Sequence, residues 1–350
     1  MAATTNPLHN TFPLPCPSVS RQILTVAGIR LTVHGLAELA PSAHHVACLW
    51  LLHPRLQDAH AMAPLAAHII STYNNTTRTA TATGSPASPS PPGLIAVAFD
   101  QRNHGTRLVD PLHNEAWRAG NPRHAQDMFS CYHGTATDLS QLLDHLSSYL
   151  FVAPSSPAIT THLVLGISLG GHAAWHCLLG DPRITAGIVA IGCPDYTRLM
   201  ADRARLSKRE TFGASFVGSP DFPPALQHAV AQYDPAGLLL PTLFNPVGHD
   251  TRPTPAQLER FKTMLAARLQ RKHILNLSGK QDKLVPYAAG EPFLNVLKHV
   301  VDTHEDLAIT FEDVLFDGVG HAFPKPMADK ATAWITNLLT AQDPVVVSKM

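Results

Sequence analysis

The residues best suited to chemistry lie between Gly166 and Gly170, in the sequence Gly-Ile-Ser-Leu-Gly. An apolar stretch precedes them and a helix-forming stretch follows, so Ser168 is predicted to lie on a tight turn from a strand into a helix. A serine hydroxyl becomes a nucleophile only when a base lies beside it and backbone N–H groups face the reacting atom. Such a turn lifts the hydroxyl away from its own backbone, and the helix N-terminus favours a developing negative charge. Ser168 is therefore the candidate nucleophile.

This serine needs a sheet to carry it, and the hydrophobic pattern of the chain predicts one. Apolar and polar residues alternate over 21–27 and 29–38, which indicates an antiparallel pair of strands. Short apolar runs near 45–52, 94–99 and 186–191 are predicted to be buried strands, and further strands are predicted near 273–277 and 308–315. Strands that alternate with helices form a mostly parallel sheet with helices on both faces.

Changes in composition divide the rest of the chain. Residues 1–20 contain four prolines and are predicted to be a flexible N-terminal segment, and residues 341–350 a C-terminal tail. Residues 71–93 are rich in Thr, Ser, Ala and Pro, which predicts a disordered surface insertion. From 194 to 272 polar helical pieces and proline-rich joints replace the alternation of strands and helices, so an inserted lid is expected there. The core is then formed by residues 21–193 and 273–340.

The order of these motifs resembles that of the α/β-hydrolase fold family, over about residues 21 to 340. In that family a serine, an acid and a histidine follow one another along the chain, each on a loop after a strand. Asp282, in Gly-Lys-Gln-Asp-Lys-Leu-Val-Pro, resembles the family's Gly-x-x-Asp-x-x-Val-Pro acid loop. His321, in Gly-Val-Gly-His-Ala-Phe, follows the next predicted strand. The resemblance implies an α/β fold with an inserted helical lid and a triad of Ser168, Asp282 and His321.

Each member of such a triad has a chemical role. His321 would remove the Ser168 proton and later return it to the leaving group. Asp282 would hold the imidazole tautomer and stabilise its positive form without itself being protonated. Asp195 is the alternative acid, because it directly follows the preceding predicted strand, where some members of the family keep their acid.

An oxyanion hole requires two N–H donors that face the reacting carbonyl oxygen. The first is expected to be the backbone N–H of Leu169, the residue after the nucleophile. The second should come from the loop after the first buried strand, where relatives show His-Gly and this chain has His53-Pro54-Arg55. Because proline has no N–H, the second donor is assigned to Arg55, with Leu56 as the alternative. His53 is expected to brace this loop.

The sequence Asp-Gln-Arg-Asn-His-Gly from residue 100 resembles the family's Asp-x-Arg-x-x-Gly loop. Its expected role is structural, with Asp100 and Arg102 bracing neighbouring loops through charge-assisted hydrogen bonds. A long loop is predicted over 106–132. An amphipathic helix is predicted over 136–150, with Asp138 among the residues that cap its start.

Composition limits the classes of partner and cofactor. The 350 residues carry 26 basic and 26 acidic side chains, so the formal charge is zero and no nucleic-acid partner is expected. The five cysteines are scattered and lack metal-ligand spacing. They are predicted to be free thiols in a reducing compartment, and neither a metal nor a cofactor is expected. No apolar run reaches the length of a membrane span.

Two terminal features bear on localisation. The N-terminal residues lack the continuous apolar stretch of a secretory signal. The C-terminal tripeptide Ser348-Lys349-Met350 resembles the peroxisomal address Ser-Lys-Leu. A cytoplasmic location is predicted, with peroxisomal import through this tripeptide as the alternative.

These observations predict a serine hydrolase that cleaves a carboxylic ester or thioester through an acyl-enzyme on Ser168. Acyl transfer on the same fold and a non-catalytic ligand-binding protein are the alternatives, because a fold does not fix the reaction. The substrate is expected to be a small molecule. An apolar acyl part is favoured by the leucines of the predicted lid, namely Leu226, Leu238, Leu239, Leu240 and Leu243.

Overall fold

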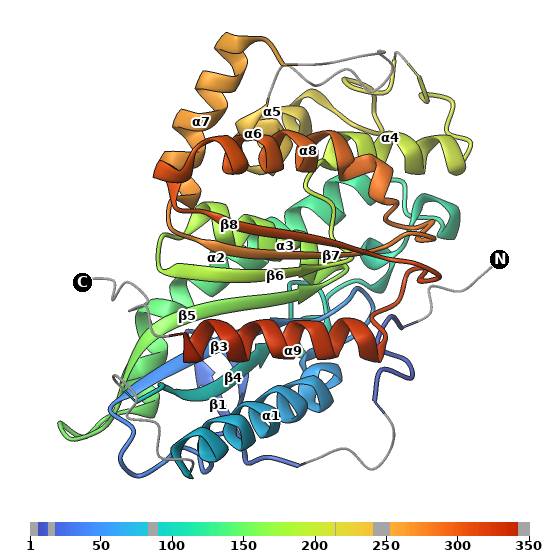
Figure 1. Ribbon diagram of the computed structural model, residues 1–350. Coiled ribbons are helices and arrows are strands. Elements are labelled where there is room, and N and C mark those ends of the chain that lie inside the picture. The colour runs from blue at the N-terminus through green and yellow to red at the C-terminus, as the bar shows by residue number, and fades with distance from the viewer. Residues whose placement is uncertain (1–5, 13–17, 83–89, 214, 241–252, 342–350) are drawn as a thin grey trace.

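A twisted sheet forms the centre of the computed structural model, which describes the chain except residues 1–5, 13–17, 83–89, 214, 241–252 and 342–350 (Figure 1). The described strands run in the order β1-β2-β4-β3-β5-β6-β7-β8. They are β1 (Arg21–Val26), β2 (Ile29–His34), β3 (His45–Leu52), β4 (Gly93–Phe99), β5 (Ala158–Ile167), β6 (Ile184–Ala190), β7 (His273–Gly279) and β8 (Thr310–Phe316). Antiparallel pairing joins β1, β2 and β4, and every later neighbour is parallel. The predicted mostly parallel sheet is confirmed.

Helices cover both faces of this sheet (Figure 1). On one face α1 (Ala63–Ala82) and α9 (Lys325–Thr340) pack together, and Ile70 and Ile335 belong to the same buried cluster. On the other face lie α2 (His124–Leu150), α3 (Leu169–Gly180) and α8 (Tyr287–Thr303), where the rings of Trp175 and Phe293 are 6.0 Å apart. The central strands are buried on both sides, which is why they appear as unbroken apolar runs in the sequence.

The segment between β6 and β7, predicted to be a lid, is helical in its described part. It contains α4 (Tyr196–Leu206), α5 (Pro224–Tyr233), α6 (Pro235–Leu239) and α7 (Pro255–Leu269), which gather with α8 beside the sheet in Figure 1. The last three of these helices begin with proline. The first N–H groups of a helix have no acceptor within it, so a proline there loses no hydrogen bond. Three prolines of this segment, Pro224, Pro235 and Pro255, therefore mark helix starts.

Helix α1 extends into the segment that is predicted to be disordered. Residues 71–82 are helical, whereas the sequence pattern places them at the start of a disordered insertion. Tyr73 is buried and its hydroxyl donates a hydrogen bond to the carbonyl of Pro92 at 2.6 Å, which fixes this part of the helix to the start of β4. The threonine hydroxyls here donate to carbonyls one turn earlier, so they remain satisfied within a helix. The rest of the predicted insertion, 83–89, lies outside the described residues.

Helix α2 begins earlier than predicted, at His124, and the predicted loop 106–132 contains short 3₁₀ turns before it. Asp138 therefore lies in the middle of a helix, and the prediction that it caps a helix start is wrong. Its carboxylate pairs with Arg102 at 2.9 Å and with Arg107 at 2.8 Å. The first turns of α2 pack against loops as well as the sheet, so they carry no simple apolar period.

Part of the N-terminal segment is held in place, which corrects the expectation of a flexible stretch over 1–20. The backbone N–H of Phe323 donates to the carbonyl of Pro7 at 2.8 Å, and the Thr11 hydroxyl donates to the carbonyl of Phe323 at 2.7 Å. Thr11 is also buried. Residues 6–12 thus lie against the loop that carries His321.

The described helices pack on or beside the central sheet. None of them combines the length and apolar character that a membrane crossing requires. The tripeptide Ser348-Lys349-Met350, with its predicted peroxisomal address, lies outside the described residues.

The start of α3 packs directly against the end of β3. A Cβ atom built on Gly170 would lie 2.1 Å from the carbonyl oxygen of Leu52. A Cβ atom on Gly166 would lie 1.9 Å from the carbonyl oxygen of Gly170. Both obstructing atoms belong to the backbone, so neither can rotate away as a side chain would.

The variant Gly170→Ala is expected to lower the free energy of unfolding by about 3 kcal/mol, at the upper end of the usual cost of overpacking, because the obstructing atoms belong to the backbone. Gly180→Ala is the matched control at the other end of α3, where no heavy atom lies within 4 Å of the added Cβ. It should change that free energy by less than about 1 kcal/mol. Urea denaturation measures both, and equal stability of the two variants would contradict the close packing described above.

Candidate active site

Ser168 occupies the turn between β5 and α3 in a strained backbone conformation, with φ 56° and ψ −113°. A non-glycine residue in this region costs about 1–3 kcal/mol and persists only where its surroundings hold it. The Ser168 N–H donates to the carbonyl of Ala190 at 2.9 Å, and the Ser168 carbonyl accepts from the N–H of His172 at 3.0 Å. The backbone is therefore fixed on both sides of the serine.

The structure brings together the three residues selected from the sequence. Ser168 Oγ lies 2.9 Å from His321 Nε2, and His321 Nδ1 lies 2.8 Å from Asp282 Oδ2. A carboxylate can only accept, so Nδ1 carries the imidazole proton. Nε2 then has its lone pair free to accept the serine O–H. This arrangement of hydrogen bonds is the one that a serine needs in order to lose its proton to a base.

The loops that carry Asp282 and His321 follow the adjacent strands β7 and β8 and lie in close contact. A Cβ on Gly279 would come within 2.5 Å of the carbonyl oxygen of Gly320, so only glycine permits this approach. Asp282 Oδ1 accepts hydrogen bonds from the N–H groups of Leu284 and Val285, both at 2.8 Å. One carboxylate oxygen is thus held by the backbone of its own loop, which aims the other at the imidazole.

The alternative acid, Asp195, has a different position. Its carboxylate accepts from the backbone N–H of Arg198 at 2.9 Å and pairs with Arg198 Nε at 3.2 Å, so it caps the start of α4. Burial raises the pKa of Asp195 to about 6. In the described chain, the carboxylate that contacts His321 is that of Asp282.

The predicted oxyanion donors lie at the start of α3 and in the loop after β3. Leu169 is the first residue of α3, so its N–H has no acceptor within the helix. His53 is buried, its Nε2 accepts from the N–H of Gln101 at 2.9 Å, and its Nδ1 donates to the carbonyl of Pro54 at 2.8 Å. Burial lowers the pKa of His53 to about 4, so it is neutral and braces the loop as predicted. Arg55 remains the predicted second donor.

The loop that begins at Asp100 also has its predicted bracing role. The Asp100 carboxylate accepts hydrogen bonds from the backbone N–H of Ala59 at 2.8 Å and from the N–H and hydroxyl of Thr106 at 2.7 and 2.6 Å. These bonds join the loops that follow β3 and β4. A Cβ on Gly105 would lie 2.3 Å from the Asp100 carboxyl carbon, which explains the glycine in this motif.

A cavity of about 10 Å³ lies beside Ser168. This is room for about one water molecule. Part of its wall comes from outside the sheet and its loops: Pro7 from the N-terminal segment, Met128 from α2 and Arg203 from α4. These three residues were not among the predicted site residues. No local sequence pattern indicates them, because only the folding of distant segments brings them beside the serine.

The leucines that favour an apolar acyl part lie elsewhere. Leu226, Leu239 and Leu240 are buried in the core, Leu238 is half-buried, and Leu243 lies outside the described residues. None of the four described leucines lines the cavity beside Ser168. The lid composition is therefore explained by packing and gives no information on the substrate.

Two arginines give this cavity a positive charge. Arg55 and Arg203 both line it, together with Ser168 and His321. Burial, and then the nearby charge of Arg55, lower the pKa of Arg203 to about 10. Burial likewise lowers the pKa of Arg55. Both guanidinium groups remain charged at neutral pH.

The candidate metal ligands and the thiols of the described chain are dispersed. The described residues contain no group of three or more His, Cys, Asp or Glu side chains that could hold a metal ion. Four cysteines are free thiols, namely Cys48, Cys131, Cys177 and Cys193. The fifth, Cys16, lies outside the described residues.

Comparisons with known proteins were made at the level of sequence and of structure. The sequence matches no protein-family model, and a comparison with curated proteins finds no match either. Solved structures do match. TT1662 from Thermus thermophilus is 17% identical, with a TM-score of 0.51, over 92% of this chain and 99% of that one.

Two further solved structures are similar at lower scores. The esterase of the archaeon Pyrobaculum calidifontis is 14% identical, with a TM-score of 0.49, over 93% of this chain and 88% of that one. The Pyrococcus horikoshii acylaminoacyl peptidase is 11% identical, with a TM-score of 0.47, over 94% of this chain and 43% of that one.

Three observations point to the same fold. They are the order and direction of the strands, the serine on the turn between β5 and α3, and the structural likeness to TT1662. Identities this low establish the fold and not the substrate. The protein therefore has the α/β-hydrolase fold, as the sequence motifs predict.

Proposed function

We propose that this protein is a serine hydrolase that cleaves a carboxylic ester or thioester through an acyl-enzyme on Ser168. The observation that supports this proposal most directly is the chain of hydrogen bonds from Ser168 Oγ to His321 and on to Asp282, at 2.9 and 2.8 Å. It lies at the carboxyl ends of β5, β7 and β8, where open α/β sheets bind their ligands.

In the proposed reaction His321 Nε2 takes the proton of Ser168 while Oγ attacks the carbonyl carbon of the substrate. Asp282 stabilises the imidazolium that forms, because its Oδ2 accepts from Nδ1 throughout. The imidazolium then gives its proton to the departing alcohol or thiol, which leaves an acyl-enzyme. A water molecule repeats the sequence on the acyl carbon and releases the acid.

Two backbone N–H groups are proposed to stabilise the negative charge that develops on the carbonyl oxygen. The N–H of Leu169 opens α3, and the helix dipole adds to its effect. The N–H of Arg55 is the proposed second donor, and its place in the wall of the same cavity supports this assignment. One such donor contributes about 3–4 kcal/mol to transition-state stabilisation.

We also propose that residues 194–272 act as a lid over the sheet. Arg203 supports this role, since α4 brings it to the wall of the cavity beside Ser168. A cytoplasmic location remains a prediction from the scattered cysteines.

Labelling with a fluorophosphonate probe tests the nucleophile. The wild-type protein should label at one site, because only an activated serine attacks the phosphorus atom. Ser168→Ala should show no labelling, as measured by intact-protein mass spectrometry. An unlabelled wild type, or equal labelling of the variant, would refute the assignment of Ser168.

The assignment of the acid is tested by a pair of asparagine variants. Asp282→Asn should lower kcat about 10⁴-fold, because an amide cannot hold the same imidazole tautomer. Asp195→Asn is the matched control: the amide oxygen can still accept from the N–H of Arg198, so kcat should change less than about threefold. If Asp195→Asn caused the larger loss, the roles of the two acids would be reversed.

The type of reaction is tested with one acyl group on different leaving groups. We expect the wild type to hydrolyse the aryl ester and the thioester, and to cleave the corresponding anilide at least about 10²-fold more slowly, since an amine is a poor leaving group until it is protonated. Liquid chromatography of the products, with and without added alcohol, measures hydrolysis and acyl transfer separately. Faster cleavage of the anilide would indicate a peptidase or amidase. Formation of an ester product at low alcohol concentration would indicate an acyltransferase.

A further inference from the structure

Arg55 and Arg203 differ from the other arginines of the described chain. Six described arginines are half-buried, and of these only Arg55 and Arg203 have no carboxylate within ion-pair distance in the described residues. The remaining partly buried arginines each contact an aspartate, in the pairs Arg107–Asp138, Arg183–Asp181, Arg198–Asp195 and Arg209–Asp221. The fold thus neutralises its partly buried arginines everywhere except beside Ser168.

The described partners of the two guanidinium groups are neutral. Arg55 Nη1 donates to the carbonyl of Asn114. Arg203 Nη1 lies 3.2 Å from His124 Nε2 and 2.8 Å from Met128 Sδ, and its Nη2 donates to the carbonyl of Leu284 at 3.3 Å. Arg203 Nε is shielded from solvent and has no hydrogen-bond partner among the described residues. A thioether is a weak acceptor, so the donors of Arg203 are incompletely satisfied.

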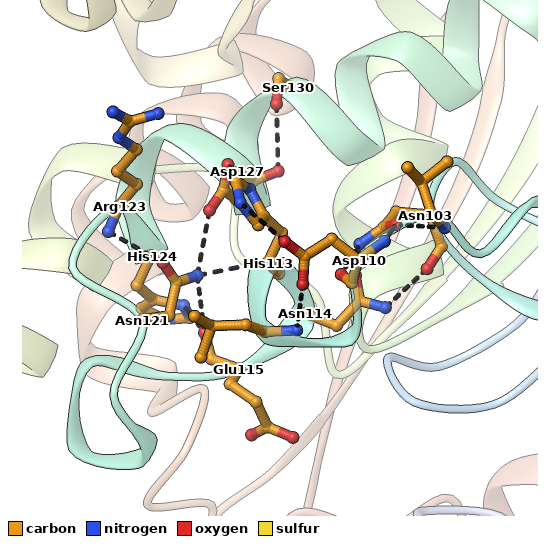
Figure 2. A network of polar contacts seen from close by, with 12 residues as sticks. Asn103, Asp110, His113, Asn114, Glu115, Asn121, Arg123, His124, Asp127 and Ser130 are labelled. Carbon is orange, nitrogen blue, oxygen red and sulfur yellow. Dashed lines mark hydrogen bonds and ion pairs between the residues drawn. The ribbon is translucent and has the colours of Figure 1, made fainter.

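A network of polar contacts holds these neutral acceptors in place (Figure 2). His124 Nδ1 donates to the carbonyl of Glu115 at 2.9 Å, which leaves Nε2 as an acceptor facing Arg203. Asn114 Nδ2 donates to the carbonyl of Asn103 at 2.6 Å, and this bond fixes the carbonyl that Arg55 reaches.

The same network directs its acidic groups to other partners. The Asp127 carboxylate contacts His113 at 2.9 Å and Asn121 at 3.0 Å. The Glu115 side chain points away from the network in Figure 2. The loop therefore presents neutral acceptors to the two arginines, a carbonyl to Arg55 and an imidazole to Arg203. The charge of Glu115, which makes no ion pair with Arg55, only partly offsets the effect of burial on the Arg55 pKa.

We propose that Arg55 and Arg203 bind a carboxylate of the substrate, so that the enzyme acts on esters or thioesters that carry a negative charge near the scissile bond. This inference rests on the proposed function of Ser168. Holding a charge away from water without a counter-ion is costly, and a bound carboxylate supplies that counter-ion. It also forms shorter, stronger hydrogen bonds with guanidinium than a carbonyl or a thioether does. Met128 Sδ is the partner it would replace.

The proposed substrate class is a monoester or monothioester of a short dicarboxylic acid. A suitable pair of probes is p-nitrophenyl hemisuccinate and its methyl-capped form, p-nitrophenyl methyl succinate, which has the same acyl skeleton without the charge. Hydrogen bonds to a charged group change affinity by about tenfold to a hundredfold. We expect the wild-type kcat/KM to be higher for the charged probe by about that factor. A third probe, acetylsalicylate, carries the carboxylate on the alcohol side and distinguishes the two halves of the substrate.

The variants Arg55→Gln and Arg203→Gln test the assignment. Each should lower the ratio of kcat/KM for the charged probe to kcat/KM for the capped probe about tenfold or more, because the substitution removes the guanidinium and keeps the backbone N–H. The matched control is Arg198→Gln, which removes an arginine of the same helix whose charge is already paired with Asp195. It should leave the ratio between the two probes unchanged.

The outcomes separate this inference from the proposed function. If the wild type labels with fluorophosphonate and shows no preference for either carboxylate-bearing probe over the capped one, the inference is overturned and the hydrolase proposal stands. If the arginine variants lose activity equally on all probes, the arginines only position the loops, and the inference is again overturned. If the wild type neither labels nor hydrolyses any probe, the proposed function fails, and the inference with it.

Discussion

The candidate site depends on one constraint, the direct contact of backbone with backbone where β5 turns into α3. Ser168 has a left-handed φ of 56°, and the glycines on either side leave no room for a Cβ. The end of β3 lies against this turn, since the carbonyl of Leu52 approaches Gly170. The serine hydroxyl, the first N–H of α3 and the loop after β3 therefore occupy fixed positions relative to one another. No part of the proposed chemistry could be assembled on a looser turn.

A second close contact determines the position of the proposed base, His321. Because β7 and β8 are neighbours, the loops that follow them meet, and Gly279 permits an approach that any side chain would prevent. Asp282 then holds His321 from one side while Ser168 meets it on the other. Both contacts rest on glycines in the motifs, which is the physical reason why those motifs include them.

The residues that surround the serine come from other parts of the chain than the proposed triad. Three separate parts of the chain close the cavity, with Pro7, Met128 and Arg203 each contributing to its wall. Two of the residues in that wall, Arg55 and Arg203, keep their charge without a described carboxylate. The proposed triad thus bears on the general reaction class, whereas the polarity of this wall bears on which esters the proposed enzyme would accept.

The sequence by itself determined the strands, the burial of the central ones and the order of the motifs, because local apolar patterns and glycine-containing turns depend mainly on neighbouring residues. It could not locate the true ends of α1 and α2, since Tyr73 and Asp138 are held there by partners distant in the chain. Only the tertiary structure decided that Asp195 caps α4, that Leu226, Leu239 and Leu240 are core residues, and that Arg203 lines the cavity beside Ser168. Each of these depends on contacts between distant segments, which leave no periodic signal in the sequence.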